Sequence, residues 1–326
     1  IYNGYLHTEL GGGLISNSLE PLSVVLGARY VSHDQFGSHY TYEFNPKVQV
    51  TKSALVYGAV TTGFNAPSLY QLYSPTRGGT GFTNRGNDNL DPEKSVSYEL
   101  GWKQQISPAF SFELSAFKTE VSDIIQYVYL WNGNTSVGNL SAVDYLGDTY
   151  INASQQDIKG VELSLTANPT AKLRFQGNIS LTESTLTFGP DDINETYTGD
   201  NHVQIYESGQ FVTENKEIEG LTRRPSVNAF VSASYEATDA LRFTLDSRFV
   251  GNRDDVFYSA NLGPFGALDR SNVSGYNLTD LGVRYALTKR LSVTGKIENI
   301  FNTQYQEIKG YRTRGRGVFL KASFSL

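Results

Sequence analysis

Apolar and polar residues alternate with a period of two along most of the chain. In one segment Val96, Tyr98, Leu100 and Trp102 fall on one face, and Ser97, Glu99, Gly101 and Lys103 fall on the other. The same alternation recurs from Leu22 to Tyr30, from Leu173 to Leu181, from Leu241 to Asp246 and from Leu291 to Glu298. Successive side chains of a β-strand point to opposite faces, so the pattern predicts strands with one apolar and one polar face. About thirteen such segments can be traced, and no helical period of about 3.6 competes with them.

The connections between these segments alternate between short and long. Short turns are expected near residues 51–53, 107–108, 168–172, 238–240 and 288–289, and long connections at 63–93, 131–147, 189–224, 251–273 and 302–315. Most of the strands reach the roughly 10 residues that a tilted strand needs to cross a bilayer. Short turns on one rim and long, extracellular loops on the other are typical of outer-membrane barrels. We therefore predict an all-β chain that forms a transmembrane, antiparallel, up-and-down β-barrel.

A soluble β-sandwich or a β-propeller would also alternate with a period of two. The strands of sandwiches average only about 5 or 6 residues, which is shorter than most of the segments in this chain. A propeller would show a blade repeat of about 40 to 50 residues, and no such repeat is evident. Both features favour the barrel.

The composition fits a chain that meets lipid with every second residue of its strands. No run of about 18 apolar residues predicts a membrane helix. The 21 Tyr, 18 Phe and 2 Trp can supply the aromatic girdles of a barrel at the two membrane interfaces. The chain has no Cys, which excludes disulfides, thiolate metal sites and cysteine nucleophiles. Its formal net charge of -6 argues against a nucleic-acid partner, which would require a basic surface.

Several motifs resemble those of one transporter family. Residues 63–73, followed by 89–95 and 98–102, resemble the mid-barrel signature of TonB-dependent outer-membrane transporters. Residues 297–302 (Ile-Glu-Asn-Ile-Phe-Asn) are similar to the penultimate-strand motif of these transporters. Residues 310–316 (Gly-Tyr-Arg-Thr-Arg-Gly-Arg), with 251–259 and 275–281, are similar to the cobalamin (vitamin B12) receptor branch. Related siderophore and haem receptors share parts of this last match.

The resemblance implies a 22-stranded barrel that encloses an N-terminal plug domain and is energised through TonB. With about thirteen strands, residues 1–326 are expected to be the C-terminal portion of such a barrel, with the plug absent. The other partners that it implies are the remaining N-terminal strands, the lipid bilayer of the bacterial outer membrane, a small-molecule ligand and, in some members, a surface lipoprotein. No cofactor is expected in this chain, because the calcium-binding loops of the family belong to the N-terminal part of the barrel.

The function implied by the resemblance is active import of a scarce, bulky nutrient, with cobalamin ahead of a ferric siderophore or haem. A passive porin-like channel is the alternative from a different class. No enzyme activity is expected, because no GxSxG elbow or comparable spacing raises the Ser, His and Asp residues above background. The acidic pairs Asp191-Asp192 and Asp254-Asp255 lack the alternating ligands of a calcium loop, and the histidines lack HExxH spacing.

Ligand contacts are expected among aromatic and polar residues of the long loops, which can cover a large ligand and hydrogen-bond its amides. The candidates are Tyr70, Tyr73, Phe82, Arg85, Tyr129, Trp131, Tyr258, Tyr311 and Arg312. Each of them could instead belong to an interfacial girdle or pack within a loop, and Tyr129 and Trp131 are the most girdle-like.

Three charged residues of the motifs have expected partners inside the barrel. Glu93 and Glu99 are expected where they could pair with cations of the barrel or the plug. Arg316 could bind ligand, or it could pair across neighbouring strands with Glu298.

Overall fold

The computed structural model describes residues 1–75, 83–84, 86–131, 145–152, 155–188, 201–202, 206–207, 210–211, 216–261 and 267–325. The long strands are β1 (Tyr2–Gly11), β2 (Leu22–His33), β3 (Gly37–Thr51), β4 (Ala54–Asn65), β6 (Glu93–Ser107), β7 (Phe110–Ser122), β10 (Gln155–Thr170), β11 (Leu173–Phe188), β16 (Val227–Thr238), β17 (Leu241–Val250), β20 (Tyr276–Ala286), β21 (Leu291–Glu298) and β22 (Gly317–Phe324). The connections carry β5 (Thr83–Asn84), β8 (Ile125–Trp131), β9 (Tyr145–Asn152), β12 (Asn201–His202), β13 (Tyr206–Glu207), β14 (Gln210–Phe211), β15 (Lys216–Glu219), β18 (Arg253–Ser259) and β19 (Ala267–Val273). Helical turns are η1 (Gly12–Leu14), η2 (Asn17–Leu19) and α1 (Leu69–Tyr73). In the part of the chain that the structure describes, no helix has the length and apolar character needed to cross a membrane.

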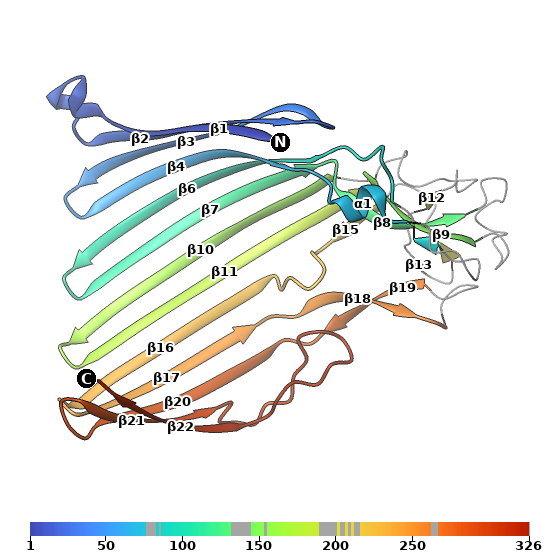
Figure 1. Cartoon of the computed structure of the whole chain (residues 1–326). Helices are drawn as coiled ribbons and strands as arrows, with labels where there is room; N and C mark the ends of the chain where they lie inside the picture. The colour runs from blue at the N-terminus through green and yellow to red at the C-terminus, as the bar shows by residue number, and fades with distance from the viewer. Residues whose placement is uncertain are drawn as a thin grey trace.

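The long strands form one antiparallel sheet. Its order is β1-β2-β3-β4-β6-β7-β10-β11-β16-β17-β20-β21-β22, with β15 paired to β11 off this path. Each strand therefore pairs with the next long strand along the chain, and Figure 1 shows the sheet curving from β1 to β22. The thirteen strands of this path confirm the predicted up-and-down architecture.

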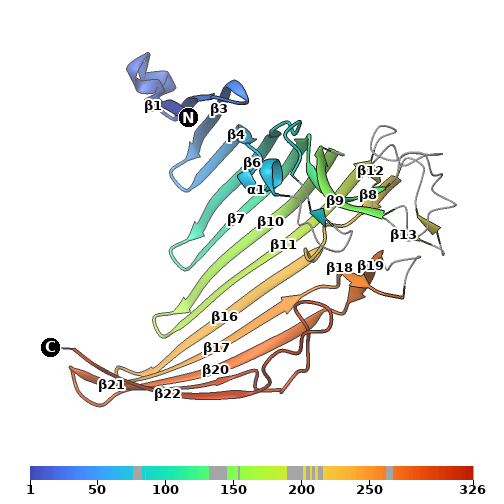
Figure 2. The same cartoon turned by 45° about the vertical axis from the view of Figure 1, so that its right-hand side comes forward.

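The two ends of the strands carry different connections, as predicted. Figures 1 and 2 show the tight turns of most strand pairs at one end of the sheet and the long loops at the other. Four register shifts occur in the sheet, between β3 and β4, β6 and β7, β10 and β11, and β16 and β17, and all four lie beside a tight turn. Such an extra residue bends the strand locally and helps it to enter the turn. The first strands depart from the rule, because β2 and β3 are joined at the loop end by residues 34–36 alone.

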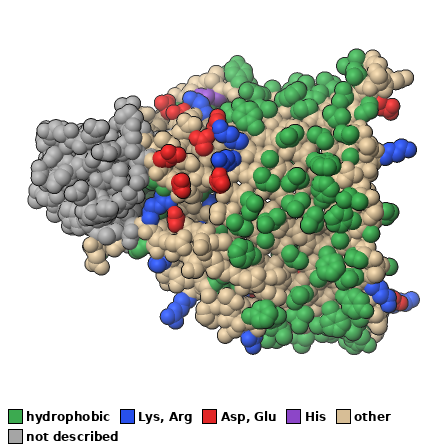
Figure 3. Space-filling model, turned by 180° about the vertical axis from the view of Figure 1, so that it is seen from behind, with side chains coloured by type: hydrophobic (Ala, Val, Ile, Leu, Met, Phe, Trp, Pro, Cys, Tyr) green, Lys and Arg blue, Asp and Glu red, His purple; other side chains and the backbone are tan. Residues whose placement is uncertain are grey.

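One face of the sheet is apolar. The register places Leu100 of β6 between Gly58 of β4 and Ala116 of β7. Leu100 remains 63% exposed, and Figure 3 shows apolar side chains spread over this face as a broad band. Figure 3 shows charged side chains gathered between this band and the loop end. On β7, Lys118 follows Ala116 by two residues in the direction of the loop end and lies 3.7 Å from Asp157. An apolar surface of this extent is typical of a lipid-facing barrel wall.

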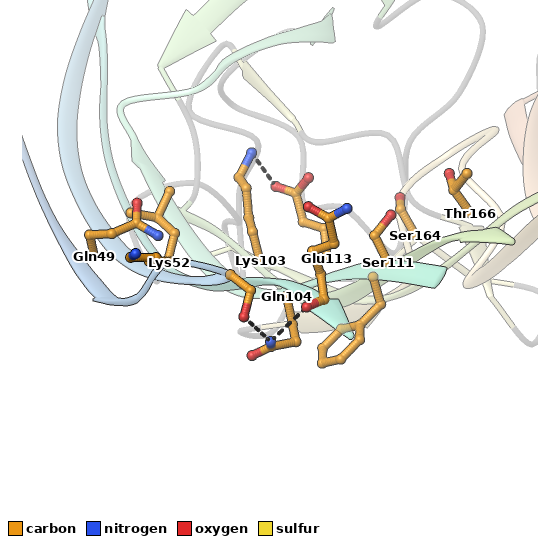
Figure 4. Close-up of a pocket in the computed structure, with 12 residues that line it drawn as sticks. Gln49, Lys52, Lys103, Gln104, Ser111, Glu113, Ser164 and Thr166 are labelled. Carbon is orange, nitrogen blue, oxygen red and sulfur yellow. Dashed lines mark hydrogen bonds and ion pairs between the residues drawn. The ribbon is translucent and has the colours of Figure 1, made fainter. Parts of the chain in front are cut away.

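The opposite face is lined by paired polar side chains. Near the tight turns Lys103 Nζ lies 2.8 Å from Glu113 Oε1 beside a cavity of about 360 Å³ (Figure 4). The hydroxyl of Tyr57 contacts Glu99 at 2.9 Å and Glu113 at 3.1 Å. The Tyr57 ring lies across Gly101, where an added Cβ would be 2.1 Å from it, so only glycine leaves room for this crossing.

Within the described part of the barrel, the two motif carboxylates accept hydrogen bonds from uncharged donors, and the predicted pairing with cations of the plug stays a prediction. Glu99 binds the Tyr57 hydroxyl, and Glu93 accepts hydrogen bonds from Asn65 Nδ2 at 2.8 Å and from the Ile125 N–H at 2.9 Å. Neither carboxylate has a cation partner among the described residues. The reason is geometric, because cross-strand neighbours with hydroxyl, amide and N–H donors already reach them.

The two faces make a testable prediction on β11. Ile179 belongs to the apolar face and Gln176 to the polar face of the same strand. We expect Ile179→Arg to lower the free energy of unfolding of the full-length protein by about 2–4 kcal/mol, because it places a charge in the lipid-facing band. Gln176→Arg is the matched control and should change it by less than about 1 kcal/mol. The folded fraction at each denaturant concentration can be measured by heat-modifiable gel mobility, and equal losses for both variants would contradict the assignment of the faces.

Candidate ligand-binding site at the outer rim

The loop between β4 and β6 begins with a capped helical turn. Ser68 Oγ accepts a hydrogen bond from the Gln71 N–H at 3.2 Å, and Gln71 Oε1 accepts one from the Ser68 N–H at 2.8 Å. This capping box fixes α1, and burial of Leu72 beneath it holds the turn against the protein. Tyr70 and Tyr73 of α1 stay about half exposed.

Both tyrosines contact other outer segments. The Tyr70 ring meets that of Tyr150 edge to face at 6.4 Å, and Tyr150 meets Tyr127 in the same way at 5.6 Å. The Tyr73 hydroxyl donates to Gln35 Oε1 at 2.6 Å. The structure therefore brings together α1, the β8–β9 hairpin and the turn between β2 and β3 in one partly exposed aromatic surface, which we call the tyrosine cluster (Tyr70, Tyr73, Tyr127 and Tyr150).

Hydrogen bonds between asparagine side chains and the main chain hold the tyrosine cluster in place. Asn152 Nδ2 donates to the carbonyl oxygen of Asp91, and Asn152 Oδ1 accepts from the Asp91 N–H at 2.7 Å. Asn87 Nδ2 donates to the carbonyl oxygen of Tyr150 at 2.8 Å. Because these contacts join the loop to the β8–β9 hairpin at two points, the aromatic surface is fixed before any ligand arrives.

A second set of contacts ties the last outer loop (residues 299–316) to β18. Asp255, whose side chain is 1% exposed, accepts hydrogen bonds from the Lys309 N–H at 2.6 Å, from Arg223 Nε at 2.6 Å and from the Val256 N–H at 2.8 Å. Arg253 is buried and donates to the carbonyl oxygens of Gln306 and Glu307. We call Arg253 and Asp255 the loop anchor.

The charge of Asp255 is stabilised by these donors. Burial by itself would raise the pKa of the Asp255 carboxyl, but the Lys309 N–H and Arg223 outweigh it and hold this pKa below its ordinary value. Asp255 is therefore ionised at neutral pH. The neighbouring carboxylate of Asp254 points the other way along β18 and lies 3.2 Å from Arg270.

The last outer loop exposes two of the predicted ligand residues at its tip. Tyr311 is 71% exposed and Arg312 is also exposed, while Thr313 turns back to donate to the carbonyl oxygen of Tyr305 at 2.7 Å. The predicted pairing of Arg316 with Glu298 is wrong, because Arg314 and Lys296 bind Glu298. The Arg316 N–H instead donates to Asn302 Oδ1 at 3.0 Å.

The predicted ligand residues thus fall into three groups. Tyr70 and Tyr73 lie in the tyrosine cluster, and Tyr311 and Arg312 lie at the tip of the last loop, with no contact between the two pairs among the described residues. Phe82 and Arg85 lie outside the described residues, as do the side chains of Tyr129 and Trp131 on β8 and of Tyr258 on β18. The analysis of the sequence missed Tyr127, Tyr150 and the loop anchor, although residues 251–259 had been singled out as a motif.

No metal centre is evident in the described part of the chain, where no group of three or more His, Asp and Glu side chains could hold an ion. Asp254 and Asp255 are occupied by arginine and N–H donors, while Asp191 and Asp192 lie outside the described residues. The arrangement at the outer rim is suited to binding through aromatic surface and hydrogen bonds.

Comparison with known families decides the class of the protein. Residues 14–300 match the model of the TonB dependent receptor-like β-barrel family. The chain belongs to the TonB-dependent receptor β-barrel family. As a member of this family it is an integral β-barrel protein of the bacterial outer membrane, which agrees with the lipid-facing band of Figure 3.

Solved structures share the fold of this TonB-dependent receptor barrel. The siderophore receptor PirA of Acinetobacter baumannii is 18% identical with a TM-score of 0.69, over 99% of this chain and 45% of that one. A variant of the ferric enterobactin receptor PfeA of Pseudomonas aeruginosa is 18% identical with a TM-score of 0.67, over 94% and 43%. The ferripyoverdine receptor of P. aeruginosa is 15% identical with a TM-score of 0.65, over 99% and 38%. The chain therefore spans less than half the length of these receptors.

The loop anchor predicts a local change when Asp255 is replaced. We expect Asp255→Ala to raise the amide hydrogen-exchange rate of residues 306–310 by about 10-fold or more, because a hydrogen bond to a charged group contributes about 1.5–3 kcal/mol. The matched control is Asp254→Asn, which removes a charge from a partly exposed pair with Arg270 and should leave the exchange rate of residues 306–310 unchanged. Mass spectrometry of the full-length receptor in detergent can follow both. Unchanged protection in Asp255→Ala would show that other contacts hold the loop.

The same anchor predicts a pH dependence. The pKa of Asp255 is lower in the folded state than the value of about 3.9 in the unfolded chain. Its contribution is therefore complete above about pH 5 and disappears as the pH falls through the folded pKa. Exchange protection of residues 306–310, corrected for intrinsic rates, should stay constant from pH 5 to 8 and fall only in stronger acid. Loss of protection between pH 6 and 7 would contradict this assignment.

Proposed function

We propose that this chain is part of an outer-membrane receptor that binds a scarce, bulky nutrient at its outer loops and imports it with energy supplied through TonB. The observation that supports this most is the fixed outer rim, where the tyrosine cluster and the tip of the last loop expose Tyr70, Tyr73, Tyr311 and Arg312. A rim held by the loop anchor and by Asn152 loses little entropy when it binds a ligand.

In this proposal the rim tyrosines, Arg312 and the polar face of the strands have separate roles. Tyrosine rings of the rim cover the broad, partly apolar surface of a macrocycle or chelate. Arg312 at the tip of the last loop donates to its amide or phosphate oxygens. The polar face of the strands then provides a wettable wall from the rim toward the tight turns. TonB acts through a plug domain, which the family places before the barrel, and a surface lipoprotein that covers the loops remains a prediction.

Two ligand classes are supported by separate observations. Cobalamin is favoured by residues 310–316, whose sequence is similar to the cobalamin receptor branch and which form the exposed tip of the last loop. A ferric siderophore is favoured by the similar solved structures, which are siderophore receptors. A passive porin-like channel is the alternative from a different class, and it would conduct small solutes without TonB.

Titration calorimetry of the full-length receptor in detergent tests the proposal. Cyanocobalamin is titrated first, and a ferric siderophore and haem are then tested as competitors. We expect the bound ligand to lose at least about 10-fold in affinity, or about 1.4 kcal/mol, in the double variant Tyr311→Ala and Arg312→Ala. Lys289→Ala, in a tight turn at the opposite rim, is the control and should bind normally.

The outcomes separate the alternatives. Cobalamin binding that depends on Tyr311 and Arg312 establishes the cobalamin receptor. Binding of an iron chelate without cobalamin establishes the siderophore receptor. Absence of binding for all three ligands, together with ion conductance in planar bilayers that needs no TonB, would reject active import in favour of a channel.

A further inference from the structure

One arginine at the outer end of the sheet has an unusual backbone conformation. In the described part of the chain, four residues other than glycine have a positive φ, namely Asp123, Arg223, Asn299 and Asn302. Asp and Asn enter the left-handed region readily, because their short polar side chains can hydrogen-bond locally. Arg223, with a φ of 62°, lacks this help, so its conformation costs free energy. Such a conformation persists only where the surrounding contacts impose it.

Arg223 lies in a break between β15 and β16. Both strands pair with β11, but residues 220–226 between them leave the ladder, and Figure 1 shows the irregular path of the chain at the outer end of β16. The ladder stops where the Gly220 N–H donates to the carbonyl oxygen of Ser184, and it resumes where the Thr182 N–H donates to that of Ser226, both at 2.8 Å. We call residues 220–226 the strand break.

Arg223 joins the strand break to β18. Its N–H donates to the carbonyl oxygen of Asp254 at 2.7 Å, and its Nε donates to Asp255 Oδ1 at 2.6 Å. A terminal nitrogen of the guanidinium group also contacts the carbonyl oxygen of Val256 at 3.4 Å. Three successive residues of β18 thus hold both the main chain and the side chain of Arg223, and they account for its left-handed conformation.

The carboxylate that binds Arg223 also binds the last outer loop. Asp255 Oδ1 accepts from Arg223, and Asp255 Oδ2 accepts from the Lys309 N–H at 2.6 Å. Because Asp255 is buried, the loss of one donor leaves an oxygen without a partner and disturbs the position of the whole carboxylate. The contact with the other donor is then weakened as well. Tyr311 and Arg312 follow Lys309 by two and three residues.

We infer that Arg223 is a positioning residue for ligand binding by the last outer loop, which it couples to the strand break through Asp255. The role in ligand binding rests on the proposed function. The two states are an engaged Arg223, left-handed and held by β18, and a released Arg223 with a relaxed backbone. A ligand that stabilises the loop favours the engaged state, and by reciprocity the engaged state raises the affinity for the ligand.

Hydrogen exchange without ligand tests the coupling from the strand break to the loop. Arg223→Asn removes the guanidinium group and supplies a residue that adopts left-handed backbone readily. We expect exchange of residues 306–310 in the full-length receptor to become about 10-fold faster, because Asp255 loses a charged donor. Arg224→Asn is the matched control. Arg224 carries the same charge, and its side chain has no hydrogen bond or ion pair within the described residues, so exchange should stay unchanged.

A second pair of variants tests the coupling from the loop to the strand break. Lys309→Pro removes the N–H that Asp255 accepts, whereas Lys309→Ala keeps it. We expect Lys309→Pro to accelerate exchange of residues 220–224 by about 5-fold or more, which is the lower end of typical coupling between sites. Lys309→Ala should leave these residues unchanged. Residues 220–224 are distant from position 309 in the sequence, so a purely local effect of proline on the loop does not reach them.

Ligand-dependent exchange tests the role in binding, with cyanocobalamin and a ferric tris-catecholate as probes. In the wild type, a bound probe should slow exchange of residues 306–312 and also of residues 220–224. In Arg223→Asn, a saturating probe should slow exchange of residues 306–312 alone, and its Kd should rise by about 5-fold or more. If Arg223 were merely structural, the variant would keep the ligand-dependent change in the strand break.

The other outcomes would overturn the inference. Unchanged exchange of residues 306–310 in Arg223→Asn, or of residues 220–224 in Lys309→Pro, would show that the two segments are independent. Equal acceleration in all strands of Arg223→Asn would assign Arg223 to global stability. A probe that protects only the last loop of the wild type would remove the role in binding and leave the import function standing. Failure of both probes to bind would reject that role together with the proposed function, while the ligand-free variants still decide the coupling.

Discussion

Backbone hydrogen bonding is the constraint on which the rest of this structure depends. A strand that faces lipid has no water to satisfy its N–H and C=O groups, so each group must pair with a neighbouring strand. The continuous antiparallel ladder meets this requirement for the strands between β1 and β22, and in the described part of the chain these two edge strands are each paired on one side. Once the ladder is set, every second side chain faces lipid, and the alternation of the sequence becomes the lipid-facing and polar faces.

The same strand register determines which side chains of the polar face can contact one another. Gly101 lies opposite Tyr57, so the Tyr57 ring can cross β6 and reach Glu99 and Glu113. Arg248 lies opposite Phe230 and Leu278, so no neighbour on the sheet can satisfy it. The same pairing rule therefore produces a closed polar network at one place and an unmatched cation at another.

Regular strands could be predicted from the sequence because their signal is local and repeated. Segments such as 96–103 carry several alternations, and the tight turns between strands set the rim to which each connection belongs. The short helix α1 escaped prediction, since five residues are too few to show a helical period and its stability comes from Ser68 and Gln71. The different roles of Asp254 and Asp255 could not be predicted from the sequence either. As neighbours on a strand they point to opposite sides, and only Asp255 is buried.

The contacts of the candidate site could not be predicted from the sequence. Tyr70 meets Tyr150 from a distant part of the chain, and no local pattern links the two. The sequence also could not show which arginine of the last outer loop pairs with Glu298. Asn299 and Asn302 adopt positive φ values of 51° and 55°, and the resulting turn brings Arg314 to Glu298 in place of Arg316. Left-handed backbone at asparagine is a property of the folded loop that alternation along a strand does not reveal.

The loop anchor recognises the last outer loop through its main chain. Asp255 accepts from the N–H of Lys309, and Arg253 donates to the carbonyl oxygens of Gln306 and Glu307, so neither contact depends on which side chains those positions carry. Mutation at 307 and 309 can therefore change the exposed surface while these main-chain contacts are kept, whereas Gln306 also holds the loop through its side chain, which accepts from the Gly310 N–H at 3.1 Å. The path of the last outer loop and the side chains that it exposes are therefore determined by different groups of the protein.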